Sequence, residues 1–174
     1  LTGLAPDRAR RVHHSTTVSR SRTLAVGAII RDDRGRFLLV QRLRDPQAGR
    51  WTVPGGKGDP VDTVGPNGIR DDADVLVAAV IREIAEETAV DAEVVRLTSV
   101  DVTPMVTYPN GDQTRYLDVC FLVRHVAGTP RAADDENTEV AWFAPDDLPA
   151  NLAETSRLRI EKALSDAAEA WFRR

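Results

Sequence analysis

The chain of 174 residues is 42% hydrophobic and 29% charged, which is typical of one globular domain with a core of its own. A net charge of −4 argues against a surface that binds nucleic acid by neutralising phosphates. No apolar run is long enough to span a membrane and no signal-peptide pattern opens the chain, so we expect a cytoplasmic protein. The lone Cys120 excludes an internal disulfide, and its apolar neighbours predict a buried strand residue.

The first half of the chain predicts an arm, two strands, a loop and a helix. Residues 1–21 are rich in Arg, Ser, Thr and His without periodicity, which indicates a loose N-terminal arm. Strands are predicted over 23–30 and 36–42, and the glycine-containing turn between them predicts a hairpin. The turn-rich segment 57–73 is interpreted as an inserted loop. Apolar residues at helical spacing predict a helix over 75–88.

The second half predicts three strands and a closing helix. The strands are expected over 93–102, 115–125 and 139–143. The amphipathic pattern of the last segment predicts a C-terminal helix over 154–172. Its expected buried stripe is Leu158, Ala163, Leu164, Ala167 and Trp171. The order of strands, helix, strands, helix predicts an α+β fold with a mixed sheet between helices, as a single domain over 22–174.

Three carboxylates in the predicted helix indicate a metal site. Glu83, Glu86 and Glu87 stand at i, i+3 and i+4, so they project from one helical face. Their mutual repulsion calls for a counter-charge, and Mg²⁺ or Mn²⁺ suits oxygen ligands. A solvated acidic face is the competing interpretation of such a cluster alone. The upstream turn Pro54-Gly55-Gly56 favours a site, because two glycines let the backbone approach a ligand closely.

These residues together form a recognisable pattern. Gly56, Asp74 and the segment 82–90 (REIAEETAV) resemble the Nudix box, G-x5-E-x7-R-E-U-x-E-E-x-G-U, where U is a bulky aliphatic residue. The REUxEE core matches at every position. Asp74 stands where the box has Glu, and Ala89 stands where it has Gly. The gap between Gly56 and Asp74 is 12 residues longer than the box allows.

The resemblance covers about residues 22–152 and implies a fold and an activity. The implied fold is the Nudix-type α/β/α sandwich. The implied reaction is Mg²⁺-dependent (or Mn²⁺-dependent) hydrolysis of a diphosphate bond in a nucleoside diphosphate linked to another moiety. A nucleoside triphosphate and a sugar nucleotide both remain open as the small-molecule substrate. Dimers are frequent in the family, so a homodimer is expected, without a nucleic-acid or membrane partner.

The resemblance also implies a ligand set and its support. The metal ligands would be Glu83, Glu86, Glu87 and the backbone carbonyl of Gly55. Arg82 would hold the carboxylates in place by pairing with Glu86 one turn on, and also with Asp74.

The same resemblance implies the catalytic and substrate-binding residues. Glu83, Glu86 and Glu136 are the expected catalytic residues. The general base that takes a proton from the attacking water would be Glu83, or Glu136 on a later acidic loop. Arg42, at the end of a strand leading into the site, and Gly56 are expected to bind the substrate phosphates.

Three alternatives accompany this interpretation. A nucleotide-binding sensor on the same scaffold would keep the fold without turnover, and the departures at Asp74 and in the loop are compatible with it. An isomerase of related fold would need a catalytic cysteine, a role that fits Cys120 poorly because its strand is apolar. The segment 57–73 is interpreted equally as a tolerated surface excursion or as a lid over the site.

Overall fold

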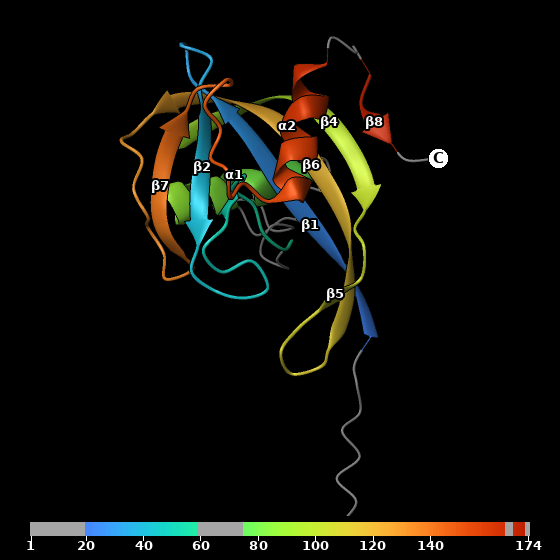
Figure 1. The fold of residues 1–174 in the computed structure, drawn as a ribbon. Helices are drawn as coiled ribbons and strands as arrows, with labels where there is room; N and C mark the ends of the chain where they lie inside the picture. The colour runs from blue at the N-terminus through green and yellow to red at the C-terminus, as the bar shows by residue number, and fades with distance from the viewer. Residues whose placement is uncertain (1–19, 59–74, 166–168, 173–174) are drawn as a thin grey trace, which may run out of the picture.

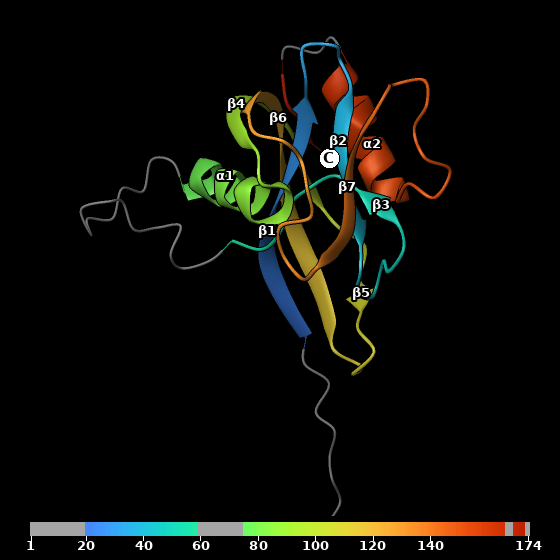
Figure 2. The same cartoon turned by 90° about the vertical axis from the view of Figure 1, so that its left-hand side faces the viewer.

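A mixed β-sheet lies between two helices in the computed structural model, which describes residues 20–58, 75–165 and 169–172. Helix α1 (Val75–Thr88) covers one face of the sheet, and α2 (Glu154–Leu164) covers the other (Figures 1 and 2). The expected α+β sandwich is therefore confirmed. The described strands are β1 (Arg20–Arg31), β2 (Phe37–Arg42), β3 (Trp51–Thr52), β4 (Asp91–Val102), β5 (Val106–Thr107), β6 (Gln113–Ala127), β7 (Asn137–Phe143) and β8 (Trp171–Phe172).

The long strands β1 and β6 form the centre of the sheet. They pair in parallel along the whole of β1, within the order β3-β2-β1-β6-β4-β8. Side chains alternate across the sheet, so Ala28 and Ile30 join the core under α1, whereas Ile29 joins the core under α2. Cys120 belongs to the second core and is fully buried, as its apolar neighbours predicted.

The predicted hairpin is confirmed in its turn and direction, but its ladder is a single pair. Strands β1 and β2 are antiparallel with one registered pair, Arg31 and Phe37, whereas β2 pairs with β7 along its whole length. Elsewhere along β1, the segment 54–57 takes the place that β2 would occupy in a longer hairpin. The N–H groups of Val26 and Ala28 donate to the carbonyls of Gly56 (2.9 Å) and Pro54 (2.8 Å). The glycine turn is thus held inside the sheet.

The expected C-terminal helix over 154–172 is wrong in its length, because α2 ends at Leu164. Ser165 is extended, and the Arg96 guanidinium donates to the carbonyl of Ala163 at 2.9 Å, which satisfies a helix-terminal acceptor. The chain then returns as β8, parallel to β4. Trp171 lies in that strand, with Lys162 Nζ 3.4 Å from its ring centroid. A cation–π contact and strand pairing therefore replace the last helical turns.

The predicted stripe of α2 is correct only in part. Ala163 is buried, but Leu158 and Leu164 are each 44% exposed. The helix instead buries Ser156 and Ile160 together with Ala163, at positions i, i+4 and i+7. Trp171 is 39% exposed and outside the helix, and Ala167 lies outside the described residues.

The predicted boundaries shift slightly at the arm and at the inserted loop. Strand β1 begins at Arg20, so two residues of the expected arm belong to the sheet, and residues 1–19 lie outside the described part. Lys57, the first residue of the expected insertion, forms a β-bridge with Ala25 in β1. Most of the expected insertion lies outside the described residues. Neither described helix is long and apolar enough to cross a membrane. The single domain over 22–174 and the cytoplasmic location stay predictions.

Candidate functional site

Glu87 fastens the glycine turn to α1. Its side chain is buried, and its carboxylate accepts a hydrogen bond from Gly55 N–H at 2.8 Å and from Asn137 Nδ2 at 3.3 Å. Arg42 Nη1 lies 3.4 Å from the same carboxylate. Burial raises the pKa of Glu87 to about 7, against the lowering effect of these three donors. Glu87 therefore holds β2, the turn and β7 together.

Glu83 packs directly against Gly56. A Cβ on residue 56 would lie 2.2 Å from Glu83 Oε2, so any larger residue there would displace the carboxylate. Burial raises the pKa of Glu83, the Arg82 guanidinium opposes this, and the charges of Glu86 and Glu136 raise it further. Glu83 therefore lies close enough to the carboxylates of Glu86 and Glu136 to be affected by their negative charge.

Arg82 ties the helix carboxylates to the turn. Its Nη1 lies 2.8 Å from Glu86 Oε2 and 3.1 Å from Glu83 Oε1, and its Nη2 donates to the carbonyl of Lys57 at 3.3 Å. The contact with Glu86 is the one expected from the sequence. The expected partner Asp74 lies outside the described residues.

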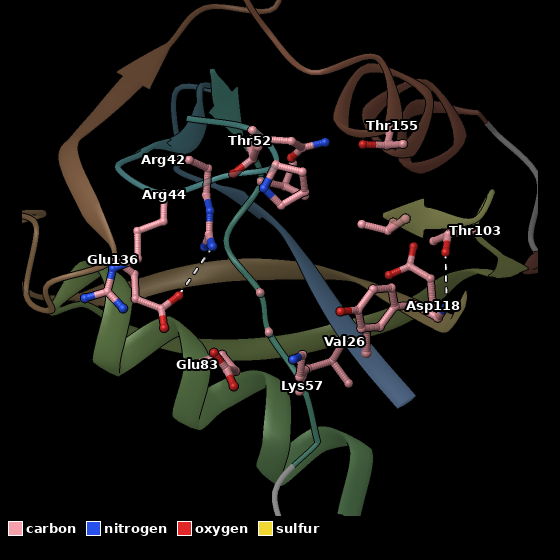
Figure 3. A pocket seen from close by; sticks show the side chains of 18 of the residues that line it. Val26, Arg42, Arg44, Thr52, Lys57, Glu83, Thr103, Asp118, Glu136 and Thr155 are labelled. Carbon is pink, nitrogen blue, oxygen red and sulfur yellow. Dashed lines mark hydrogen bonds and ion pairs between the residues drawn. The ribbon is translucent and has the colours of Figure 1, made fainter. Parts of the chain in front are cut away.

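A loop distant in sequence brings Glu136 to this cluster. The N–H groups of Arg131 and Ala133 donate to the last carbonyls of α1, those of Thr88 (3.1 Å) and Glu87 (3.3 Å), and so dock the loop on the helix end. Arg42 Nη2 then lies 3.4 Å from Glu136 Oε2, as the dashed line in Figure 3 shows. Arg42 therefore bridges Glu87 and Glu136 and lines the cavity described next. Its expected contact with substrate phosphates stays a prediction.

A cavity of about 850 Å³ extends from these carboxylates across the sheet. Glu83, Glu136 and Arg42 line one end, which we call the carboxylate end. Thr103 and Asp118 face Thr155 at the opposite end, between β6 and α2, with Lys57 between the two ends (Figure 3). The opposite end is called the β6–α2 end below.

A buried ion pair forms the wall of the β6–α2 end. Arg159 Nε donates to Asp118 Oδ2 at 2.9 Å, and Arg159 Nη2 lies 2.7 Å from Asp118 Oδ1. The Cys120 thiol donates to the same carboxylate at 3.3 Å. Burial raises the pKa of Cys120 to about 12, so the residue is a neutral thiol and a poor nucleophile at physiological pH. The isomerase alternative thereby loses its catalytic cysteine.

Sequence reasoning missed Asn137, Asp118 and Arg159. Asn137 follows the acidic loop directly, but nothing in its own sequence setting indicates that it contacts Glu87. Asp118 and Arg159 are 41 positions apart, so no local spacing joins them before the sheet and α2 meet.

The donor set fits a hard divalent cation, although the described residues do not gather three acidic, His or Cys side chains into a complete ligand set. Glu83 is largely buried, whereas Glu86 (56% exposed) pairs with Arg82 and Glu136 (49% exposed) pairs with Arg42. Glu83 and Glu86 present carboxylate oxygens, which Mg²⁺ and Mn²⁺ prefer. The excess negative charge around Glu83 is the feature that a cation would neutralise.

Comparison with known proteins gives concordant matches. The NUDIX domain family matches residues 21–164. A MutT-like protein of Streptomyces ambofaciens is 30% identical over 141 residues, which cover 81% of this chain and 75% of that protein. The 8-oxo-dGDP phosphatase NUDT18 of Danio rerio is 25% identical over 121 residues, covering 68% of this chain and 31% of its own length. The crystal structure of a MutT NUDIX hydrolase from Burkholderia pseudomallei has a TM-score of 0.62 and 33% identity, covering 81% of this chain and 97% of that one.

Proposed function

Because the chain belongs to the Nudix hydrolase family, we propose that it hydrolyses a diphosphate bond in a nucleoside diphosphate linked to another moiety, with Mg²⁺ or Mn²⁺. Nucleoside triphosphates and sugar nucleotides both stay within this class. The name of the NUDT18 relative adds an oxidised deoxyguanosine diphosphate as a candidate substrate.

The observation that carries the proposal is the gathering of Glu83, Glu86 and Glu136 at one end of a cavity large enough for a nucleotide. Glu83 comes from the predicted motif, whereas Glu136 reaches the same place through the docked loop. Arg42 and Lys57 add positive charge along the cavity wall, where they would meet phosphate oxygens.

Different surroundings favour different roles for two of the carboxylates. Glu83 is packed against Gly56 and contacts Arg82, which suits a residue that holds a metal ion in a fixed place. Glu136 is half exposed on a loop at the cavity, which suits a base that takes a proton from water. A bound Mg²⁺ would neutralise the phosphate oxygens and lower the pKa of the attacking water.

Glu87 serves the site mainly by position. Its hydrogen bond to Gly55 N–H fixes the turn whose carbonyl is expected to face the metal. Its contacts with Arg42 and Asn137 set the distance between β2 and the Glu136 loop. A direct metal contact by Glu87 stays a prediction.

The test is release of phosphate-containing products with and without Mg²⁺ from nucleoside triphosphates, oxidised guanine nucleotides, ADP-ribose and dinucleoside polyphosphates. Glu83→Gln should weaken Mn²⁺ binding, measured by electron paramagnetic resonance, and reduce turnover. Glu136→Gln should reduce kcat while Mn²⁺ binding stays at the wild-type level. Glu139→Gln, at an exposed position on β7, is the matched control.

Two outcomes would contradict parts of this proposal. Binding of one nucleotide without any turnover would favour the sensor instead. Loss of Mn²⁺ binding in Glu136→Gln, with retention in Glu83→Gln, would exchange the two roles. The homodimer stays a prediction, which the mass measured in solution tests.

A further inference from the structure

The β6–α2 end of the cavity carries chemistry that the diphosphate does not need. Tyr116 and Asp118 are two positions apart on β6, so they project from the same face of the strand. Arg159 of α2 lines the cavity beside them. The Tyr116 hydroxyl shares a hydrogen bond with that of Tyr108, which fixes the tyrosine ring at the cavity wall.

Asp118 holds the Arg159 guanidinium in one orientation and leaves one of its edges available for another hydrogen bond. Asp118 contacts Nε and Nη2, which form one edge of the guanidinium. The Nη1 edge has no hydrogen-bond partner among the residues that the structure describes, and the side chain keeps 20% of its surface exposed. Nη1 lies near Gly27 of β1, where a Cβ would be 3.7 Å away, in ordinary van der Waals contact.

The charge balance of this end favours a neutral ligand group over a phosphate. The buried Asp118 neutralises Arg159, so the pair itself offers little net positive charge to attract an anion. Arg42, at the carboxylate end, is better placed for phosphates, and Lys57, with its Nζ 6.0 Å from the ring centroids of Tyr108 and Tyr116, lies between the two ends. A guanidinium edge that is fixed and neutralised in this way suits two adjacent hydrogen-bond acceptors on a planar group.

We propose that Arg159 determines base specificity by reading the O6 and N7 acceptors of a guanine-type purine, with the base lying against Tyr116. Adenine presents an N6 donor beside N7, which would face the donors of Arg159. Asp118 is a positioning residue that fixes the guanidinium. The inference rests on the proposed function in that it takes a nucleotide as the substrate.

The experiment compares kcat/KM for GDP, IDP, 7-deaza-GDP and ADP. IDP keeps O6 and N7 and should match GDP, whereas 7-deaza-GDP and ADP should each be roughly five- to hundredfold poorer. Arg159→Lys should remove most of this discrimination by raising KM for GDP, with kcat little changed. Arg157→Lys, at an exposed position of the same helix, should leave the ratios at wild-type values.

Binding separates this inference from the hydrolase proposal. Titration of GDP and ADP into Glu83→Gln protein reports base preference without turnover. Equal affinity for the two, or a GDP preference that persists in Arg159→Lys, would overturn the role of Arg159 and leave the hydrolase proposal standing. Preference for GDP in binding, without hydrolysis of any nucleotide by the wild type, would support Arg159 and overturn the hydrolase.

Discussion

The two ends of the cavity are built in opposite ways. At the carboxylate end, Glu83 and Glu86 come from one stretch of helix whose spacing places them together, and Arg42 and Glu136 join them from β2 and a later loop. At the β6–α2 end, Asp118 and Arg159 come from separate elements that meet only across the folded sheet. The first end is organised around charge that a ligand must neutralise, whereas the second is already neutral. Local sequence therefore encodes the helical part of the carboxylate end, whereas tertiary contacts alone bring Asp118 and Arg159 together.

The largest expected effect is at the carboxylate end. Glu87→Gln removes the carboxylate that contacts Arg42 and weakens the link to Gly55. Turnover should fall about 10³-fold, which is roughly 4 kcal/mol in activation free energy. Circular dichroism should show an unchanged fold. Wild-type turnover in this variant would remove Glu87 from the site.

The β6–α2 end should respond in stability. Asp118→Ala leaves the largely buried Arg159 charge without its partner, which should lower the free energy of unfolding by roughly 3 kcal/mol in urea titrations. Glu93→Ala breaks an exposed ion pair with Arg124 and is the control, with an expected loss of less than about 1 kcal/mol. Equal losses in both variants would refute a structural role for the buried pair.

A smaller effect separates geometry from charge at the carboxylate end. Gly56→Ala would place a carbon 2.2 Å from Glu83 Oε2 and push that carboxylate aside. Turnover should drop roughly 10- to 100-fold, as for other changes that misplace a metal-binding carboxylate. Gly58→Ala, where the new carbon meets only the Leu24 side chain at 3.2 Å, is the comparison in the same assay. Equal activities would show that Glu83 tolerates displacement.

The smallest expected effect lies at the end of α1. Ala89 has φ of 57°, a left-handed conformation that is unfavourable for alanine, as the departure from the family glycine suggested. Ala89→Gly should therefore raise the free energy of unfolding by about 1 kcal/mol, measured by urea titration, without changing turnover. A decrease in stability would mean that the greater freedom of glycine in the unfolded chain outweighs the relief of strain.

Much of the fold followed from the sequence because periodicity is a local property. Helix α1 has the predicted limits, since its apolar residues repeat at helical spacing. The length of α2 was overestimated, because the Arg96 contact with Ala163 and the pairing of β8 with β4 come from a segment far along the chain and override an amphipathic pattern. The parallel pairing of β1 with β6 was not predicted, because the two strands are far apart along the chain.

The sequence by itself determined the carboxylate cluster, the glycine turn and hence the family, because each depends on residues a few positions apart. Only the tertiary structure decided that Arg42 bridges Glu87 to Glu136, that the turn lies within the sheet beside β1, and that Asp118 fixes Arg159 across the cavity. Those contacts join residues tens of positions apart, and their geometry follows from strand order and helix packing, which local residue patterns do not specify.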